Sequence, residues 1–96
     1  MHAIIRNYSD QHAKALFDLL EKNKPELEKL MRPVTGFVSY TLLRTHEGGA
    51  SVTVCHAKTG ADESAKVARD WIAKNATGIK VGPPKVTEGT VMVHVS

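Results

Sequence analysis

The sequence has only one cysteine, Cys55, among its 96 residues. A single thiol excludes an internal disulfide, and it also excludes a zinc site built from four cysteines. Cys55 lies in an apolar run, where a buried thiol usually behaves as a small inert hydrophobe. The fold must therefore be held by its hydrophobic core, and we expect neither a metal ion nor another cofactor.

Long apolar segments are also absent. No stretch approaches the ~20 residues that a membrane-spanning helix needs. The N-terminal residues 1–7 lack the charged start and long apolar run of a secretory signal. The sequence thus predicts a cytoplasmic protein without a membrane partner.

Charge does not gather at any point of the chain. The 13 Lys and Arg residues and the 10 Asp and Glu residues give a formal net charge of +3, and aromatic residues make up only 5% of the sequence. A nucleic-acid-binding domain would show a basic cluster interleaved with aromatic side chains, so we expect no nucleic acid partner. A phosphate-binding glycine loop and the nucleophile elbow of hydrolases are absent as well.

What the sequence does contain is a succession of strand patterns. Residues 2–7 and 37–45 are rich in β-branched and aromatic residues, which favour strands. Residues 50–57 alternate between apolar and polar positions, and a glycine hairpin at 46–49 joins them to the preceding strand. The last predicted strand spans residues 85–95.

Two helical patterns lie between these strands. Apolar residues recur at helical spacing over residues 13–31, but Pro25 interrupts them. We therefore expect either one kinked helix or two short helices with Asn23 as the second cap. The other predicted helix begins with Asp62 as its cap and turns Trp71 inward.

The order strand, helix, strand, strand, helix, strand predicts a single α+β domain over residues 1–96. In so short a chain, this order is typical of a ferredoxin-like βαββαβ sandwich, in which one four-stranded antiparallel sheet carries two helices on one face.

The face of the sheet that the helices leave uncovered is predicted to be apolar. A sheet face in water should carry polar residues at alternate positions, and a large exposed apolar patch usually marks an interface. We therefore predict a homodimer in which two sheets pack about a two-fold axis. The residues that alternation places on this face are Ile4, Val38, Tyr40, Leu42 and Met92.

With these features the chain resembles the dimeric α/β-barrel superfamily, and within it the antibiotic biosynthesis monooxygenase-like group. The resemblance rests on the element order, on the proline-interrupted first helix that leads into residues 33–37, on the hairpin that follows, and on Asp70 and Trp71 in the second helix. It covers nearly the whole chain. It implies a dimeric α/β barrel with a ligand cleft between the sheet and its own helices.

The resemblance also suggests site residues. Heme-degrading members of the group combine an asparagine at the end of the first strand with a tryptophan on the second helix, and Asn7 and Trp71 match these positions. His56 is a candidate base because an imidazole titrates near neutrality. Arg6 or Arg44 completes the candidates. Each of the first three also has a structural interpretation: Trp71 fills volume, Asn7 bonds nearby backbone, and His56 lies half in solvent.

Three functions remain open. Cofactor-independent oxygenation needs an electron-rich substrate that loses a proton in a dry pocket, while the protein supplies position and hydrogen bonds. The resemblance, together with Asn7 and Trp71, favours such an oxygenase-like protein, acting on a hydrophobic aromatic small molecule. The hypothesis of a heme-degrading oxygenase is weaker, because the iron-binding histidine of that group is missing from residues 72–81. A non-catalytic dimeric module that binds a small ligand or simply assembles is the third.

Overall fold

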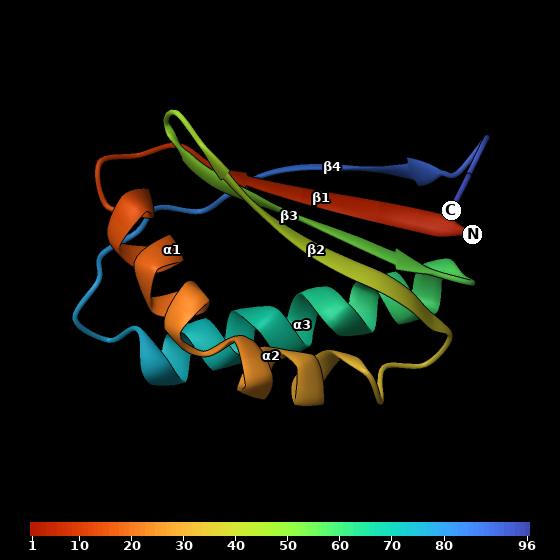
Figure 1. The fold of residues 1–96 in the computed structure, drawn as a ribbon, viewed down its shortest axis with the longest axis horizontal. Helices are drawn as coiled ribbons and strands as arrows, with labels where there is room; N and C mark the ends of the chain where they lie inside the picture. The colour runs from red at the N-terminus through yellow and green to blue at the C-terminus, as the bar shows by residue number, and fades with distance from the viewer.

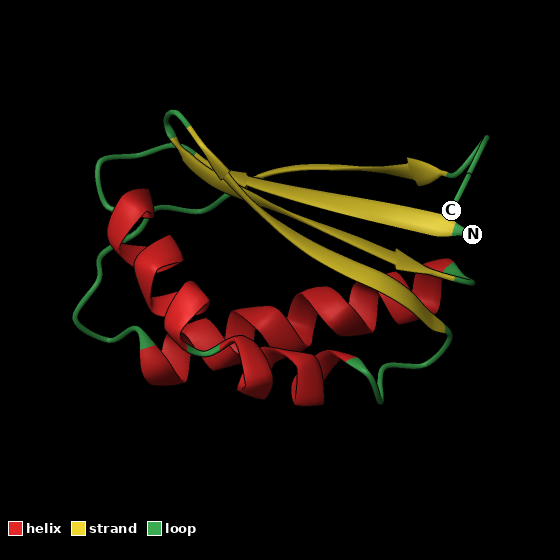
Figure 2. Ribbon diagram, viewed as in Figure 1, coloured by secondary structure: helices red, strands yellow, loops and turns green.

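A computed structural model describes all of residues 1–96 and places every helix on one face of a single sheet (Figures 1 and 2). The elements follow the predicted order, except that the first helix is divided in two. None of the three helices has the length and apolar composition that crossing a membrane requires. The elements are β1 (His2–Tyr8), α1 (Ala13–Lys22), α2 (Lys24–Met31), β2 (Phe37–Thr45), β3 (Gly48–Cys55), α3 (Lys58–Asn75) and β4 (Lys85–Thr90).

The sheet has the strand order β2-β3-β1-β4, and every neighbouring pair is antiparallel. The central strands are therefore β3 and β1, while β2 and β4 form the two edges. This arrangement confirms the predicted ferredoxin-like α+β fold. It also gives the helices one face of the sheet to cover and leaves the other face open.

The first helical segment breaks at Asn23, so the second of the two predicted alternatives is correct. Pro25 occupies the first turn of α2, where its missing N–H costs no hydrogen bond. The side-chain amide of Asn23 donates to the carbonyl of Leu19 at 2.8 Å. Asn23 thus ties down the end of α1 and does not cap α2 through its side chain.

The hairpin between β2 and β3 turns earlier than predicted. His46 and Glu47 form the turn, and the two glycines that follow already belong to β3. A Cβ atom on Gly49 would overlap the ring of Phe17. Glycine is needed here because it lets α1 lie close against the sheet.

The α3 helix also begins earlier than predicted, at Lys58. Asp62 lies one turn inside the helix, where its carboxylate pairs with the Lys58 ammonium at 3.0 Å. The cap prediction at Asp62 was therefore wrong. The prediction that Trp71 faces inward is confirmed, because the side chain is buried.

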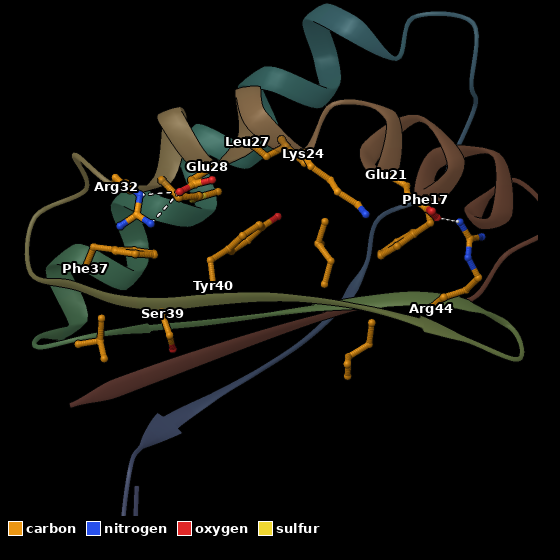
Figure 3. Close-up of a pocket in the computed structure, with 14 residues that line it drawn as sticks. Phe17, Glu21, Lys24, Leu27, Glu28, Arg32, Phe37, Ser39, Tyr40 and Arg44 are labelled. Atoms are coloured by element: carbon orange, nitrogen blue, oxygen red, sulfur yellow. Dashed lines mark hydrogen bonds and ion pairs between the residues drawn. The ribbon is translucent and has the colours of Figure 1, made fainter. Parts of the chain in front are cut away.

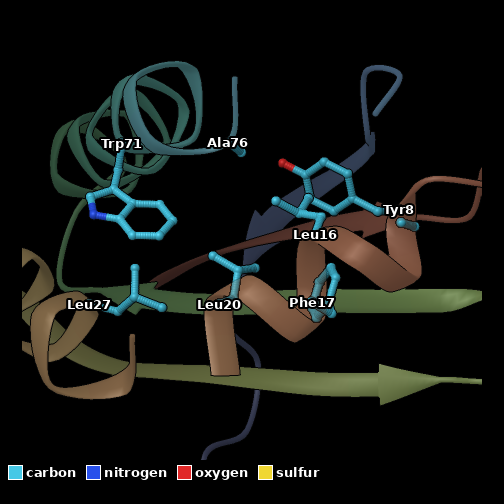
Figure 4. Close-up of a cluster of buried hydrophobic side chains, with 8 residues drawn as sticks. Tyr8, Leu16, Phe17, Leu20, Leu27, Trp71 and Ala76 are labelled. Atoms are coloured by element: carbon cyan, nitrogen blue, oxygen red, sulfur yellow. The ribbon is translucent and has the colours of Figure 1, made fainter. Parts of the chain in front are cut away.

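Two clusters of buried side chains join the helices to the sheet. In the larger one, Trp71 and Leu27 lie on one side and Tyr8 and Phe17 on the other (Figure 4). The rings of Tyr8 and Phe17 meet edge to face with centroids 5.9 Å apart. The smaller cluster contains Cys55, whose thiol pKa burial raises, in keeping with an inert side chain.

The apolar residues on the open face are not the ones that alternation predicted. Ile4 is buried, and Tyr40 and Leu42 pack against the core clusters from β2. The register of β2 against β3 shifts between Phe37 and Ser39, as in a β-bulge. Because a bulge reverses the facing of all residues on one side of it, simple alternation assigned β2 to the wrong face.

The open face is nevertheless apolar. Ile5 is 37% exposed and Leu43 is 47% exposed, and Val52 pairs with Ile5 from the neighbouring strand. Met92, which was predicted for this face, is 90% exposed but follows the end of β4. The last strand ends at Thr90, five residues earlier than predicted, and its register against β1 is continuous.

Candidate functional site

A groove of about 670 Å³ lies between edge strand β2 and helices α1 and α2 (Figure 3). Its volume falls within the range of typical small-molecule sites. Phe37 and Tyr40 project from β2 toward the helices, whereas Ser39 points to the other side of the strand (Figure 3). The groove therefore lies between the sheet and its own helices.

The walls and the rim of this groove differ in character. Apolar walls favour a hydrophobic ligand, since each square ångström of apolar surface removed from water contributes about 25 cal/mol. Charged side chains at the rim stay in water and shape the entrance. The apolar lining residues include Phe17, Leu27, Met31, Phe37 and Leu42, and the charged ones are Glu21, Lys24, Glu28, Arg32 and Arg44.

Both arginines at the rim are neutralised by carboxylates. Arg44 contacts Glu21 at 2.9 Å and Asp18 at 3.0 Å, and Arg32 contacts Glu28 at 2.7 Å. These pairs are exposed, so each contributes little to stability.

Lys24 differs from the two arginines. It makes no ion pair, and its ammonium group reaches into the groove from α2 (Figure 3). It is therefore the one rim cation without a carboxylate partner.

A second, much smaller cavity of about 10 Å³ lies deeper between the sheet and the helices. It has room for about one water molecule. Arg6, Tyr8 and Ser51 border it from the sheet, and Trp71 borders it from α3. The side chains that line both the groove and this cavity are Phe17, Leu27, Tyr40 and Leu42.

Arg6 is the charged group of this interior. It is only 8% exposed, and it shares the inward side of β1 with Ile4 and Tyr8. One guanidinium nitrogen donates to the Tyr8 hydroxyl at 2.6 Å, and the guanidinium carbon lies 5.5 Å from the Tyr8 ring centre. No carboxylate forms an ion pair with it.

The two tyrosines near Arg6 stay protonated over a wide pH range. Burial raises the pKa of Tyr40 to about 12, although the charge of Arg6 opposes the rise. Burial raises the pKa of Tyr8 as well, again against the effect of Arg6. Both phenols are therefore neutral near pH 7 and available as hydrogen-bond donors.

The structure does not bring the three predicted site residues together. Asn7 is exposed and alternates with the buried Arg6 and Tyr8, so it lies on the open side of β1. His56 is exposed just after β3, where its backbone N–H donates to the Gly36 carbonyl at 2.8 Å. Neither residue lines the groove or the small cavity.

Of the three, only Trp71 lies in the interior. Its Nε1–H donates to Glu26 at 3.0 Å and links α3 to α2. No three His, Cys, Asp or Glu side chains are grouped so that they could hold a metal ion.

The sequence reasoning missed Tyr8, Tyr40 and Lys24. Period-two alternation does place Ile4, Arg6 and Tyr8 on the same side of β1, but that side was predicted to be the open face. No sequence signal existed for Tyr40, whose facing depends on the register shift in β2.

No protein-family model matches the chain, and no characterised protein matches it in sequence. Solved structures do match it over nearly its full length. The heme degrader MhuD of Mycobacterium tuberculosis, solved with two hemes in its active site, superposes with a TM-score of 0.71 and 18% identity and covers 100% of both chains. A monooxygenase from the ActVA-Orf6 gene of Streptomyces coelicolor, solved with nanaomycin D, has a TM-score of 0.66 and 18% identity over 99% of this chain and 89% of its own.

A dimeric ferredoxin-like protein from an uncultured marine organism matches too, with a TM-score of 0.64 and 10% identity over 99% of this chain and 95% of its own. The chain therefore has the fold of the dimeric α/β barrels. Within that class it is similar to the antibiotic biosynthesis monooxygenase-like proteins. Identities this low establish the fold alone.

Alkaline titration tests the surroundings of Tyr40, which is partly buried. Below pH 10 the phenols of Tyr40 and Tyr8 are neutral in the folded and unfolded states and do not affect stability. As the pH rises from 10 toward 12, the unfolded chain loses the Tyr40 proton while the folded protein keeps it, so stability falls. We expect Tyr40→Phe to reduce this fall, measured by urea unfolding across that range. An identical pH dependence in both proteins would contradict the packing of the Tyr40 phenol against the core.

A second prediction concerns Trp71. Trp71→Phe removes buried volume and leaves Glu26 without its donor, so the free energy of unfolding should drop by about 1–3 kcal/mol. Asn7→Ala, on the exposed side of β1, serves as the control and should change stability by no more than about 0.5 kcal/mol. Chemical denaturation of the two variants compares them. An unchanged midpoint for Trp71→Phe would exclude the packing role.

Proposed function

We propose that the groove between β2 and helices α1 and α2 binds a hydrophobic aromatic small molecule, and that the protein is an oxygenase-like enzyme acting on it. The groove itself is the observation that carries this proposal. It offers about 670 Å³ between Leu27 and Met31 on α2 and Phe37 and Tyr40 on β2. A flat ring system would exchange water contacts for apolar ones on both of its faces.

The structural comparisons support the ligand class without assigning the activity. The Streptomyces coelicolor monooxygenase, which shares the fold, was solved in complex with nanaomycin D. In cofactor-independent oxygenation the substrate supplies the electrons, and the protein holds it dry and steadies the anion. Neutral hydroxyl donors such as that of Tyr40, which borders the groove, suit that second task.

Heme fits this groove poorly. None of the histidines of the chain lines the groove or the small cavity. We therefore do not propose heme degradation, and heme serves as a comparison ligand in the test.

Binding and turnover are measured with nanaomycin D and, separately, heme. We expect nanaomycin D to quench the fluorescence of Trp71, which borders the cavity behind the groove. Phe37→Glu places a charge in the apolar wall and should weaken binding about tenfold, since burying a Phe side chain is worth roughly 1.5–3 kcal/mol. Ala73→Glu, on the exposed side of α3 and outside the groove, is the control.

Oxygen uptake with the bound aromatic molecule then separates an enzyme from a binding module. Uptake that depends on protein, and that Phe37→Glu abolishes, supports the oxygenase. Tight binding without uptake leaves the groove as a ligand site and removes the enzymatic part of the proposal. Equal binding by Phe37→Glu and wild-type protein would contradict the groove as the site.

We also propose that the open face of the sheet is covered by a second copy of the chain. Ile5 and Leu43 are large apolar side chains exposed on this face, and solved proteins of the same fold are dimeric. Leu43→Lys with Ile5→Lys should convert the dimer to a monomer, measured by native mass spectrometry. Ala15→Lys, on the exposed side of α1, should leave the dimer intact. A monomeric wild-type protein would contradict this assembly.

A further inference from the structure

Arg6 is a buried cation that nothing in the chain neutralises. The carboxylates nearest the groove are already engaged, since Glu21 and Asp18 bind Arg44 and Glu28 binds Arg32. Burying a charged group without a partner costs several kcal/mol even after relaxation. A small domain has a low free energy of unfolding, so it would retain such a destabilising charge only if the charge has a function.

The donors of Arg6 are also largely unused. A guanidinium has five N–H donors, and only one nitrogen of Arg6 has a protein acceptor, the Tyr8 hydroxyl. No enclosed side-chain nitrogen or oxygen of the chain lacks a partner. The remaining nitrogens of Arg6 are therefore not completely enclosed, and Arg6 lines the small cavity.

The cavity lies directly behind the groove. Phe17, Leu27, Tyr40 and Leu42 line both spaces and form the partition between them. Tyr40 is the polar member of this partition, and its hydroxyl makes no hydrogen bond within the protein. Tyr40 therefore offers a neutral donor at the boundary between the groove and the cavity that Arg6 lines.

We propose that the ligand of the groove is an organic acid, whose aromatic body lies in the groove and whose anionic oxygen binds Arg6 in the small cavity, with the Tyr40 hydroxyl as a second donor. This inference rests on the proposed function of the groove. A carboxylate or an ionised enol satisfies the same donors. Charge-assisted hydrogen bonds to a guanidinium are about twice as strong as neutral ones, and they have their full effect in a site closed to water.

The proposal separates the role of Arg6 in binding from its role in folding. Replacing an unpaired buried charge with an apolar side chain of similar length is often neutral or stabilising. Arg6→Met should therefore keep or raise the melting temperature while it removes affinity for acids. A residue that served only the fold would lose stability on this substitution.

The test compares two ligands with the same aromatic body, 2-naphthoate and its uncharged methyl ester, by isothermal titration calorimetry. Wild-type protein should bind the acid at least about tenfold more tightly than the ester. Arg6→Met should abolish this preference and leave the affinity for the ester within about twofold. Lys24→Met, which removes the unpaired cation of the rim, should keep the preference.

The outcomes distinguish the two proposals. Equal affinity of wild-type protein for acid and ester would overturn the role of Arg6 and leave the groove intact as an aromatic site. Binding of neither ligand would overturn the groove and, with it, the role of Arg6. A preference for the acid that Lys24→Met removes would assign the anion to the rim instead. If Arg6→Met does not fold, Tyr40→Phe replaces it and should reduce the acid preference about threefold or more.

Discussion

The missing N–H of Pro25 is the constraint on which the candidate site depends. An unbroken helix over residues 13–31 would follow one axis, whereas the break at Asn23 divides it into α1 and α2. The first of these helices packs on the sheet through Phe17. The second lies opposite β2 at a distance that leaves a groove between them. The position of the ligand-sized space thus follows from one residue that cannot continue a helix.

The order and type of the elements could be predicted from the sequence, because the spacing of apolar residues follows directly from which side of a helix or strand is buried. The ends of the strands and the positions of the turns were harder to predict from the sequence. Gly48 and Gly49 suggested a turn, but these glycines belong to β3 because α1 packs so closely against them. The register shift beside Val38 left no mark in the alternation of residues, and it turned Tyr40 and Leu42 from the predicted open face into the interior.

The site was harder to predict than the fold for a related reason. Asn7 and Trp71 were chosen by their positions along the elements, yet Asn7 belongs to the open face and Trp71 to the core. Arg6 was named only as one of two arginines that could contribute charge. Arg6 matters because it is buried without a carboxylate partner. This property can be recognised only when the position of every carboxylate in the fold is known. This information comes from the tertiary structure, and no local sequence pattern contains it.

The location of the groove at the edge of the sheet has an evolutionary consequence. The central strands β1 and β3 hold the domain together, while the rim consists of exposed side chains on α1, α2 and the edge strand β2. Substitutions at Lys24 or Arg32 can therefore change the entrance without disturbing the central strands. A fold whose central strands are separate from the rim of its groove can acquire new ligands by mutation at the rim. This agrees with the very different chemistry of proteins that share the fold.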